Sequence, residues 1–113
     1  MENMIFIELI RRGYSVDVGV VELVLVKDGK KQQSQYEIDF IAGTGREKVY
    51  IQSALNVDTE TKRSQETFSL RNSGDFFRKI VIVDGNAKPW TDEDGIMYMG
   101  VIPFLLEEGG SII

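Results

Sequence analysis

The stretch covering residues 36–54, YEIDFIAGTGREKVYIQSA, constrains the fold of this chain more than any other. Two segments rich in apolar and β-branched residues flank a glycine turn at residues 43–45, which is the pattern of two paired strands. Asp39 stands between Ile38 and Phe40 in the first segment. The stretch therefore predicts an antiparallel hairpin with a carboxylate inside an otherwise apolar strand.

The size and composition of the chain limit what it can build. Its 113 residues, 42% hydrophobic and 27% charged, suffice for one domain with a modest core. No stretch approaches the roughly 18 apolar residues that a membrane helix needs, and the N-terminus lacks a basic leader followed by an apolar run. We expect a single domain over residues 1–113, placed in the cytoplasm and without membrane contact.

The absence of cysteine and histidine excludes several kinds of chemistry. Disulfides, thiolate metal sites, cysteine nucleophiles and a Ser-His-Asp triad are ruled out. The commonest zinc ligand and general base is also missing. Hydrolysis would have to rest on carboxylates with lysine, tyrosine or a hard cation such as Mg²⁺. The net charge of −5 argues against strong non-specific nucleic-acid binding, although local basic pairs such as Arg46 and Lys48 remain candidates.

Periodicity and turn signals predict an alternation of helices and strands. Helices are predicted over residues 2–12, 58–70 and 102–108, and strands over residues 14–19, 20–27, 35–42, 47–53, 77–83 and 96–101. Residues 30–34 are predicted as a mobile hairpin end, residues 84–95 as a loop, and residues 109–113 as a trailing end. The run KIVIV is apolar on both faces, which is typical of a strand covered on both sides. This order predicts an α/β fold with a mixed sheet flanked by helices.

Side-chain directions follow from these predicted elements. Strict alternation along residues 35–42 places Asp39 and Ile41 on the face opposite to Ile38 and Phe40. On the first helix, helical spacing projects Glu2 toward the buried side. The same helix is expected to carry a solvated ion pair between Glu8 and one of the two arginines at its end.

The element order, with Glu2 on a helix, Asp39 on one strand and Gln52 on the next, resembles the restriction-endonuclease-like fold of the PD-(D/E)XK nucleases, whose core is αβββαβ. It is similar to archaeal Holliday junction resolvases, which have a glutamate, an aspartate and Glu-x-Lys at these places. The resemblance implies carboxylates that hold Mg²⁺ beside the scissile phosphate and a lysine that orients water. Here Gln52 offers only a neutral amide, and Ala54 on the same strand face replaces the lysine.

A closer resemblance covers nearly the whole chain. Its segments are ENMIFIELIRRGYSVDVG, EIDFIA, KVYIQSA, ETKRSQETFSLRNSGDFFRKIVIVDG and GIMYMGVIPFLL. They resemble a C-terminal domain of unknown function of predicted prokaryotic AAA+ ATPases, in which Tyr-Ile-Gln is typical of the last hairpin strand. The resemblance implies a C-terminal domain, or an excised fragment, of a larger ATPase. The chain has no GxxxxGK[ST] loop, so the ATPase domain would be a partner in cis or in trans.

Each candidate site residue has a structural alternative. Glu2, Asp39 and Gln52 are candidates for a degenerate catalytic or metal site, but they could equally form a hydrogen-bonded polar cluster, because Gln52 in a central strand needs partners. Candidates for nucleic-acid contact are Tyr50, Lys48 and Arg46. Tyr50 could instead pack on the sheet with its hydroxyl at the rim, and Lys48 could be a solvated lysine near the turn.

These observations support three hypotheses about function. The leading one is a degenerate, non-catalytic nuclease-like module that binds nucleic acid or protein for an ATPase. The second is a Mg²⁺-dependent DNA endonuclease of the junction-resolvase kind, with an unorthodox Glu2–Asp39–Gln52 site. The third is an oligomerisation or assembly domain that touches no nucleic acid.

Overall fold

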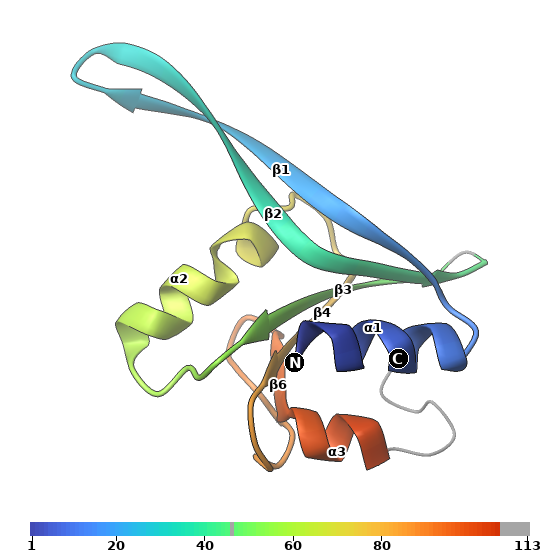
Figure 1. The fold of residues 1–113 in the computed structure, drawn as a ribbon. Helices are drawn as coiled ribbons and strands as arrows, with labels where there is room; N and C mark the ends of the chain where they lie inside the picture. Colours follow the sequence, from blue (N-terminus) through green and yellow to red (C-terminus); the bar gives the residue numbers. More distant parts are fainter. Residues whose placement is uncertain (46, 107–113) are drawn as a thin grey trace.

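The protein folds around one six-stranded sheet with the strand order β1-β2-β3-β4-β6-β5. Its computed structural model describes residues 1–45 and 47–106. The elements are α1 (Glu2–Arg11), β1 (Ser15–Lys27), β2 (Lys30–Thr44), β3 (Glu47–Ala54), α2 (Glu60–Arg71), β4 (Arg78–Val83), β5 (Trp90–Thr91), β6 (Met97–Gly100) and α3 (Val101–Leu106). Helices α1 and α3 cover one face of the sheet, and α2 covers the other (Figure 1).

The sheet is mixed, as the sequence predicts. Strands β1, β2 and β3 form an antiparallel meander, β3 and β4 run parallel, and β4 runs parallel to β6. Helix α2 makes the crossover between β3 and β4, and the Thr59 side chain caps its start by accepting a hydrogen bond from the Lys62 N–H. The prediction of an α/β fold with helices flanking a mixed sheet is confirmed.

Strand β4 is the centre of the core. Ile80 and Ile82 point toward α1 and α3, whereas Val81 and Val83 point toward α2. All four side chains are buried. The doubly apolar run therefore forms a parallel strand covered on both faces, as predicted.

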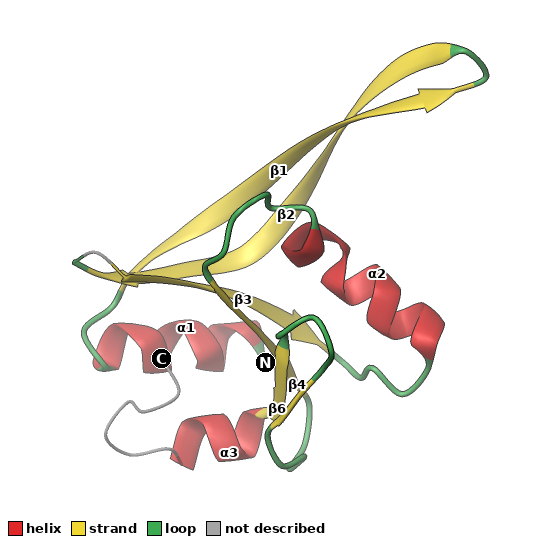
Figure 2. Cartoon of the chain, turned by 180° about the vertical axis from the view of Figure 1, so that it is seen from behind, coloured by secondary structure: helices red, strands yellow, loops and turns green. Residues whose placement is uncertain are grey.

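Strands β1 and β2 form a long two-stranded arm that extends away from the body, as Figure 2 shows from behind. Two separate strands over residues 14–27 were expected, but β1 is continuous. Asp28 and Gly29 turn the chain with positive φ angles of 54° and 74°, the geometry that an Asp-Gly hairpin turn requires. Residues 30–34, predicted as a mobile hairpin end, form the start of β2 and pair in register with β1 from the turn onward.

A β-bulge interrupts the arm at the candidate residue Asp39. Asp17 pairs with Ile41 and Gly19 pairs with Ile38, so β2 contains one more residue than β1 in this interval. The strict alternation expected for β2 is therefore wrong: Ile38 and Ile41 both pack toward α2, while Phe40 packs toward α1. The bulge therefore changes, at the position of Asp39, which face of the sheet successive side chains of β2 occupy.

The two helices on one face are joined through Arg12, which is also ion-paired with Glu8 at the end of α1. Glu8 pairs with Arg11 and Arg12 as expected, but the Glu8 and Arg12 side chains are buried rather than solvated. Arg12 also donates to the Phe104 carbonyl oxygen at 2.6 Å, and its guanidinium lies 4.7 Å from the centre of the Phe104 ring. These contacts attach α1 to α3.

The C-terminal part departs from prediction in its boundaries. The last strand is shorter than residues 96–101, and β5 lies within the predicted loop. Pro103 stands in the first turn of α3, as expected. The predicted end of this helix at residue 108 and the trailing residues 109–113 lie outside the described residues. Within the described part of the chain, none of the helices has the length and apolar character needed to cross a membrane.

Candidate functional site

Glu2, Asp39 and Gln52 come together where the β2–β3 ladder ends. The last backbone pair of that ladder joins Phe40 to Ile51. Beyond it, side chains replace the backbone partners: the Asp39 N–H donates to Gln52 Oε1 at 2.9 Å, and the Ser53 N–H donates to Asp39 Oδ2 at 2.9 Å. The two strands are therefore held together past the end of their regular pairing.

Ser53 is the residue that links the carboxylates. Its Oγ lies 2.9 Å from Asp39 Oδ2 and 3.1 Å from Glu2 Oε1. Because one hydroxyl has one proton, it can donate to only one of these carboxylates at a time. Ser53 was not among the predicted site residues, although its alternation with Val49 and Ile51 places it on the face that α1 covers. We call Glu2, Asp39, Gln52 and Ser53 the polar cluster.

The expected pairing of Gln52 and Ala54 on one strand face is consistent with the structure. Tyr50 and Ala54 pack in the core on the α2 side, so alternation places Gln52 there as well. That face is opposite to the one occupied by Val49 and Ile51. Gln52 thus approaches Asp39 from the α2 side, while Ser53 approaches it from the α1 side.

Hydrogen bonds within the polar cluster use two of the oxygen atoms that a magnesium ion could bind. A catalytic cation needs several oxygen ligands aimed at one point. Here Gln52 Oε1 accepts from a backbone N–H, and Asp39 Oδ2 accepts from both the N–H and the hydroxyl of Ser53. Among residues 1–45 and 47–106, no group of three or more His, Cys, Asp or Glu side chains is placed to hold a metal ion.

The candidates for nucleic-acid contact lie elsewhere on the sheet. The Tyr50 hydroxyl donates to Asp75 Oδ2 at 2.6 Å, and burial followed by this bond raises the pKa of Tyr50 to about 12. Lys48 is exposed, with its Nζ 6.0 Å from the centre of the Phe77 ring. Arg46 lies outside the described residues. Tyr50 packs on the sheet and is also part of a larger arrangement around Asp75.

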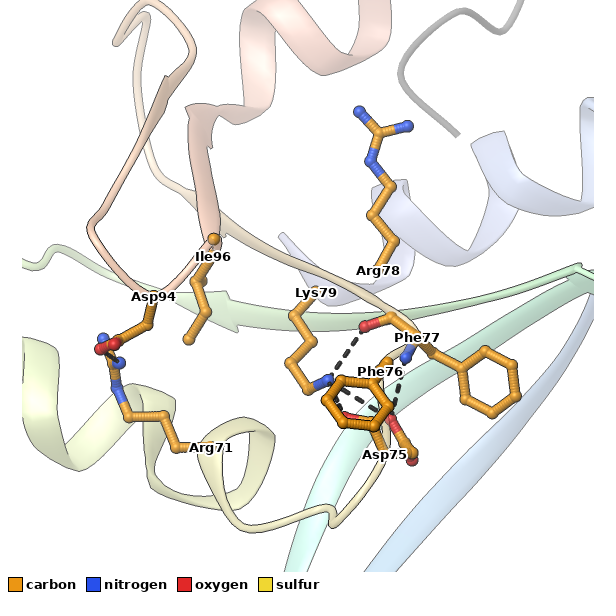
Figure 3. A pocket seen from close by; sticks show the side chains of 9 residues that line it. Arg71, Asp75, Phe76, Phe77, Arg78, Lys79, Asp94 and Ile96 are labelled. Atoms are coloured by element: carbon orange, nitrogen blue, oxygen red, sulfur yellow. Dashed lines mark hydrogen bonds and ion pairs between the residues drawn. The ribbon is translucent and has the colours of Figure 1, made fainter.

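The loop between α2 and β4 is organised by the Asp75 carboxylate. Asp75 Oδ1 accepts from the Phe77 N–H at 3.1 Å and from Lys79 Nζ at 3.3 Å. Lys79 Nζ also donates to the carbonyl oxygens of Asp75 and Phe77 (Figure 3). Burial alone would raise the pKa of Asp75, but hydrogen bonds from Tyr50, Phe77 and Lys79 together outweigh it and lower that pKa.

Aromatic and basic side chains from this loop and from the adjoining strands β3 and β4 lie in contact. The Phe77 and Tyr50 rings meet edge to face with centroids 5.7 Å apart, and Lys79 Nζ lies 5.7 Å from the Tyr50 ring centre. Phe76 is fully exposed. We call Lys48, Tyr50, Phe76, Phe77 and Lys79 the aromatic–basic cluster. Phe76 and Phe77 were not among the predicted site residues, although two adjacent phenylalanines in a polar loop after Gly74 are a visible signal.

The cluster borders a cavity of about 600 Å³. In Figure 3, Phe76 and Phe77 stand on one side of this cavity, and the ion pair between Arg71 and Asp94 stands on the other. Its size falls within the range of small-ligand pockets, about 300–1,000 Å³. The cavity therefore has an aromatic wall and an ion-paired wall.

The ion-paired wall is rigidly bonded. Asp92 Oδ2 accepts from the Tyr98 hydroxyl at 2.7 Å and from Arg71 Nη2 at 2.8 Å. Burial would raise the pKa of Asp92, but these bonds and two backbone N–H groups outweigh it and lower that pKa. Burial and the bond to Asp92 raise the pKa of Tyr98 to about 12. Arg71 is thus committed to structural partners.

Comparison with known proteins finds a similar sequence in a much longer protein. An uncharacterized protein of Haemophilus influenzae is 40% identical over 107 residues, which are 95% of this chain and 23% of that protein. The chain therefore spans about a quarter of the length of the curated relative that it matches. No protein-family model matches the chain, and no solved structure matches it.

Proposed function

We propose that this protein is a non-catalytic module with a restriction-endonuclease-like fold, which binds a macromolecular partner for an ATPase acting in cis or in trans. The order of elements supports the fold: helix α1, the antiparallel meander β1-β2-β3, the crossover helix α2 and the parallel strand β4. This order corresponds to the αβββαβ core of the nuclease superfamily that the sequence resembles.

The observation that carries the proposal is the internal bonding of the polar cluster. At the position that the resemblance assigns to Mg²⁺, Asp39 accepts hydrogen bonds from Ser53 and donates its N–H to Gln52. Ala54, at the place of the superfamily lysine, is buried in the core on the α2 side. A site whose acceptors are engaged in closing the sheet, and which has no lysine at that place, favours binding over hydrolysis.

The longer relative supports the link to a larger assembly. A sequence 40% identical to this one makes up 23% of the Haemophilus influenzae protein. In that protein, a domain of this type is therefore part of a longer polypeptide chain. The resemblance to the C-terminal domain of AAA+ ATPases supports an ATPase as that neighbour.

A metal titration tests the proposal most directly. Mg²⁺ and Mn²⁺ are titrated into the wild-type protein and into Asp39→Asn in a calorimeter, and both proteins are incubated with branched and duplex DNA. We expect no saturable metal binding up to millimolar concentration and no cleavage. Cleavage that requires Mg²⁺ and disappears in Asp39→Ala would overturn the proposal in favour of the unorthodox endonuclease.

A second candidate, an assembly domain, is favoured by the exposed face of the arm. Val18, Val20, Val24 and Val26 alternate along β1 and are 55–70% exposed. Strand β1 is also an edge of the sheet, so its outer backbone groups are available for pairing. A row of exposed valines on a free edge is typical of a protein interface.

Sedimentation of the wild type and of Val24→Lys tests this candidate. An assembly domain predicts a concentration-dependent oligomer that the substitution disrupts. Lys30→Ala, a substitution near the tip of the same arm, is the matched control. A monomer at all concentrations for the wild type would exclude self-assembly.

A further inference from the structure

We propose that strand β1 pairs antiparallel with β1 of a second copy of this chain, with Glu22 on the twofold axis and Asp17 opposite the partner's Lys27. The two arms then form one four-stranded sheet in the order β2-β1-β1-β2. The proposal rests on the assembly candidate described above, and it names the partner, the edge and the register. It is independent of the polar cluster, which lies at the other end of β2.

The outer edge of β1 is open along the arm. Strand β1 stands first in the sheet order, so within residues 1–45 and 47–106 no strand pairs with its outer side. Figures 1 and 2 both show the arm standing away from the helices and from the rest of the sheet. A ribbon of two strands is only marginally stable in water. Further strands at this edge would therefore stabilise the arm.

The edge lacks the features that usually prevent pairing with another chain. Edge strands are commonly protected by charged side chains, by proline or by a bulge. Between Glu22 and Lys27, β1 consists of the residues LVLV, of which Val24, Leu25 and Val26 are 44–70% exposed. The bulge of the arm lies in β2 and not in β1. The edge is thus suited to accepting another strand.

A twofold axis at Glu22 places each exposed valine of β1 opposite another valine. Val18 then faces the partner's Val26, and Val20 faces the partner's Val24. Cross-strand pairs of this kind are what stabilises an antiparallel sheet. A shift of the register by two residues in either direction would instead place Glu22 opposite Val20 or Val24. The strand therefore has one self-complementary register, as an interface between identical copies about a twofold axis requires.

The charges at the two ends of β1 fit the same register. Asp17 and Lys27 lie on one face of the strand, and each comes opposite the other residue of the partner, which gives two ion pairs in the dimer. The arm as a whole is neutral, because residues 15–35 contain three acidic and three basic side chains. Two arms can therefore meet without the repulsion that the net charge of −5 produces between whole chains.

Glu22 forms an unfavourable pair in this register, because like charges directly opposite each other destabilise a sheet. Its carboxylate is held on the side of β2, away from the free edge. Gln35 Nε2 donates to Glu22 Oε1 at 3.2 Å, and Gln33 Nε2 donates to Glu22 Oε2 at 3.3 Å. These bonds reduce the repulsion across the axis, and the part that remains predicts that Glu22→Gln strengthens the association.

The other edge of the arm favours a closed dimer over a filament. The ladder between β2 and β3 covers β2 only from Phe40 onward. Nearer the tip, the outer edge of β2 has the sequence KKQQSQ, over residues 30–35. Lysine and other polar side chains protect an edge from pairing. Once the two β1 edges have met, the edges that remain on the arms are therefore protected.

Sedimentation equilibrium of the full chain at low salt tests the proposal. We expect the wild type to dimerise, and Asp17→Lys and Lys27→Asp each to weaken the dimer by roughly 10- to 100-fold, because each turns two ion pairs into two repulsions. The double variant restores both pairs with the signs exchanged and should dimerise like the wild type. Glu22→Gln should tighten the dimer by roughly 3-fold. Lys62→Asp, the same change of charge on α2, is the matched control and should leave the association unchanged.

A single introduced cysteine reads the register directly, since the chain has no cysteine of its own. Glu22→Cys would lie opposite itself across the axis, with Cβ atoms about 4.5–5.5 Å apart, and should give a disulfide-linked dimer under mild oxidation. Val20→Cys and Val24→Cys would each lie roughly 13 Å along the strand from the same position of the partner and should not cross-link. Equal cross-linking of Glu22→Cys and Val24→Cys would place the axis at Leu23 and overturn this register.

Two further results would overturn the inference. A wild type that stays monomeric at all concentrations would leave the edge of β1 to a strand from a different protein. A dimer that the single charge substitutions leave unchanged, with circular dichroism confirming that the variants are folded, would place the contact on another surface while the assembly candidate still stood. Neither result bears on metal binding at Asp39, so the failure of this inference is distinguishable from the failure of the non-catalytic proposal.

Discussion

The effect of Asp39→Ala on the free energy of unfolding distinguishes a structural polar cluster from a metal site. A structural cluster predicts a loss of stability, whereas a metal site predicts a gain. In the structure, the Asp39 carboxylate accepts from the Ser53 N–H and from the Ser53 hydroxyl, both at 2.9 Å. Asp39→Ala removes both bonds and leaves the Ser53 N–H without that partner. If these bonds close the end of the β2–β3 ladder, the variant must be less stable than the wild type.

The size of the loss follows from the number and the setting of the bonds. Hydrogen bonds to charged groups contribute about 1.5–3 kcal/mol each when buried. These two share one carboxylate oxygen in a half-buried setting, so we expect a total of about 2 kcal/mol, near the lower end of that range. For a domain of this size, this corresponds to a fall of about 8 °C in the melting temperature.

Urea unfolding followed by circular dichroism, with EDTA present, measures the effect. Asp39→Asn retains a carbonyl acceptor and should lose less than about 1 kcal/mol. Glu2→Ala, on the exposed side of Ser53, is the matched control and should stay within about 0.5 kcal/mol of the wild type. A metal site behaves differently, because removing one of two carboxylates that repel each other without the cation raises stability. An Asp39→Ala variant as stable as the wild type, or more stable, would refute the structural interpretation.

Four further predictions concern the core, the ion-paired wall and the loop of Asp75. Tyr98→Phe removes a buried hydrogen bond to Asp92 and should cost about 1.5–3 kcal/mol in urea unfolding. The pKa values of Asp92 and Asp75 lie below their ordinary value of 3.8. The stability that these carboxylates contribute is therefore present above pH 3.8 and is lost as the pH falls through their lowered pKa values. An acid titration followed by circular dichroism should show this loss of stability, and the loss should be smaller in Asp92→Asn. Conversely, the pKa of Tyr98 is raised to about 12, so its contribution should persist below pH 10.0 and disappear as the pH rises through about 12, a loss absent in Tyr98→Phe. Gly100→Ala should lower the free energy of unfolding by about 1–3 kcal/mol, because the added Cβ would lie 2.5 Å from the Gly85 carbonyl oxygen. An unchanged melting temperature in thermal unfolding would contradict this packing.

The candidate site was partly predictable from the sequence. The proximity of Glu2, Asp39 and Gln52 followed from a resemblance in the order of elements. Their interactions did not, because they depend on Ser53, which lies between the two carboxylates through the pairing of β2 with β3. The aromatic–basic cluster was less predictable still: Lys48 and Tyr50 meet Phe77 and Lys79 only because β3 and β4 run parallel and in register.

The sequence by itself determined the local elements and the class of the fold. The helical spacing of α1, the Asp-Gly turn of the arm and the doubly apolar run of β4 are patterns within one segment, and local propensity and burial decide them. The tertiary structure decided which face each functional side chain occupies. One extra residue in β2 opposite β1 changes the facing at Asp39, and a bulge is a property of two paired strands that neither strand encodes alone.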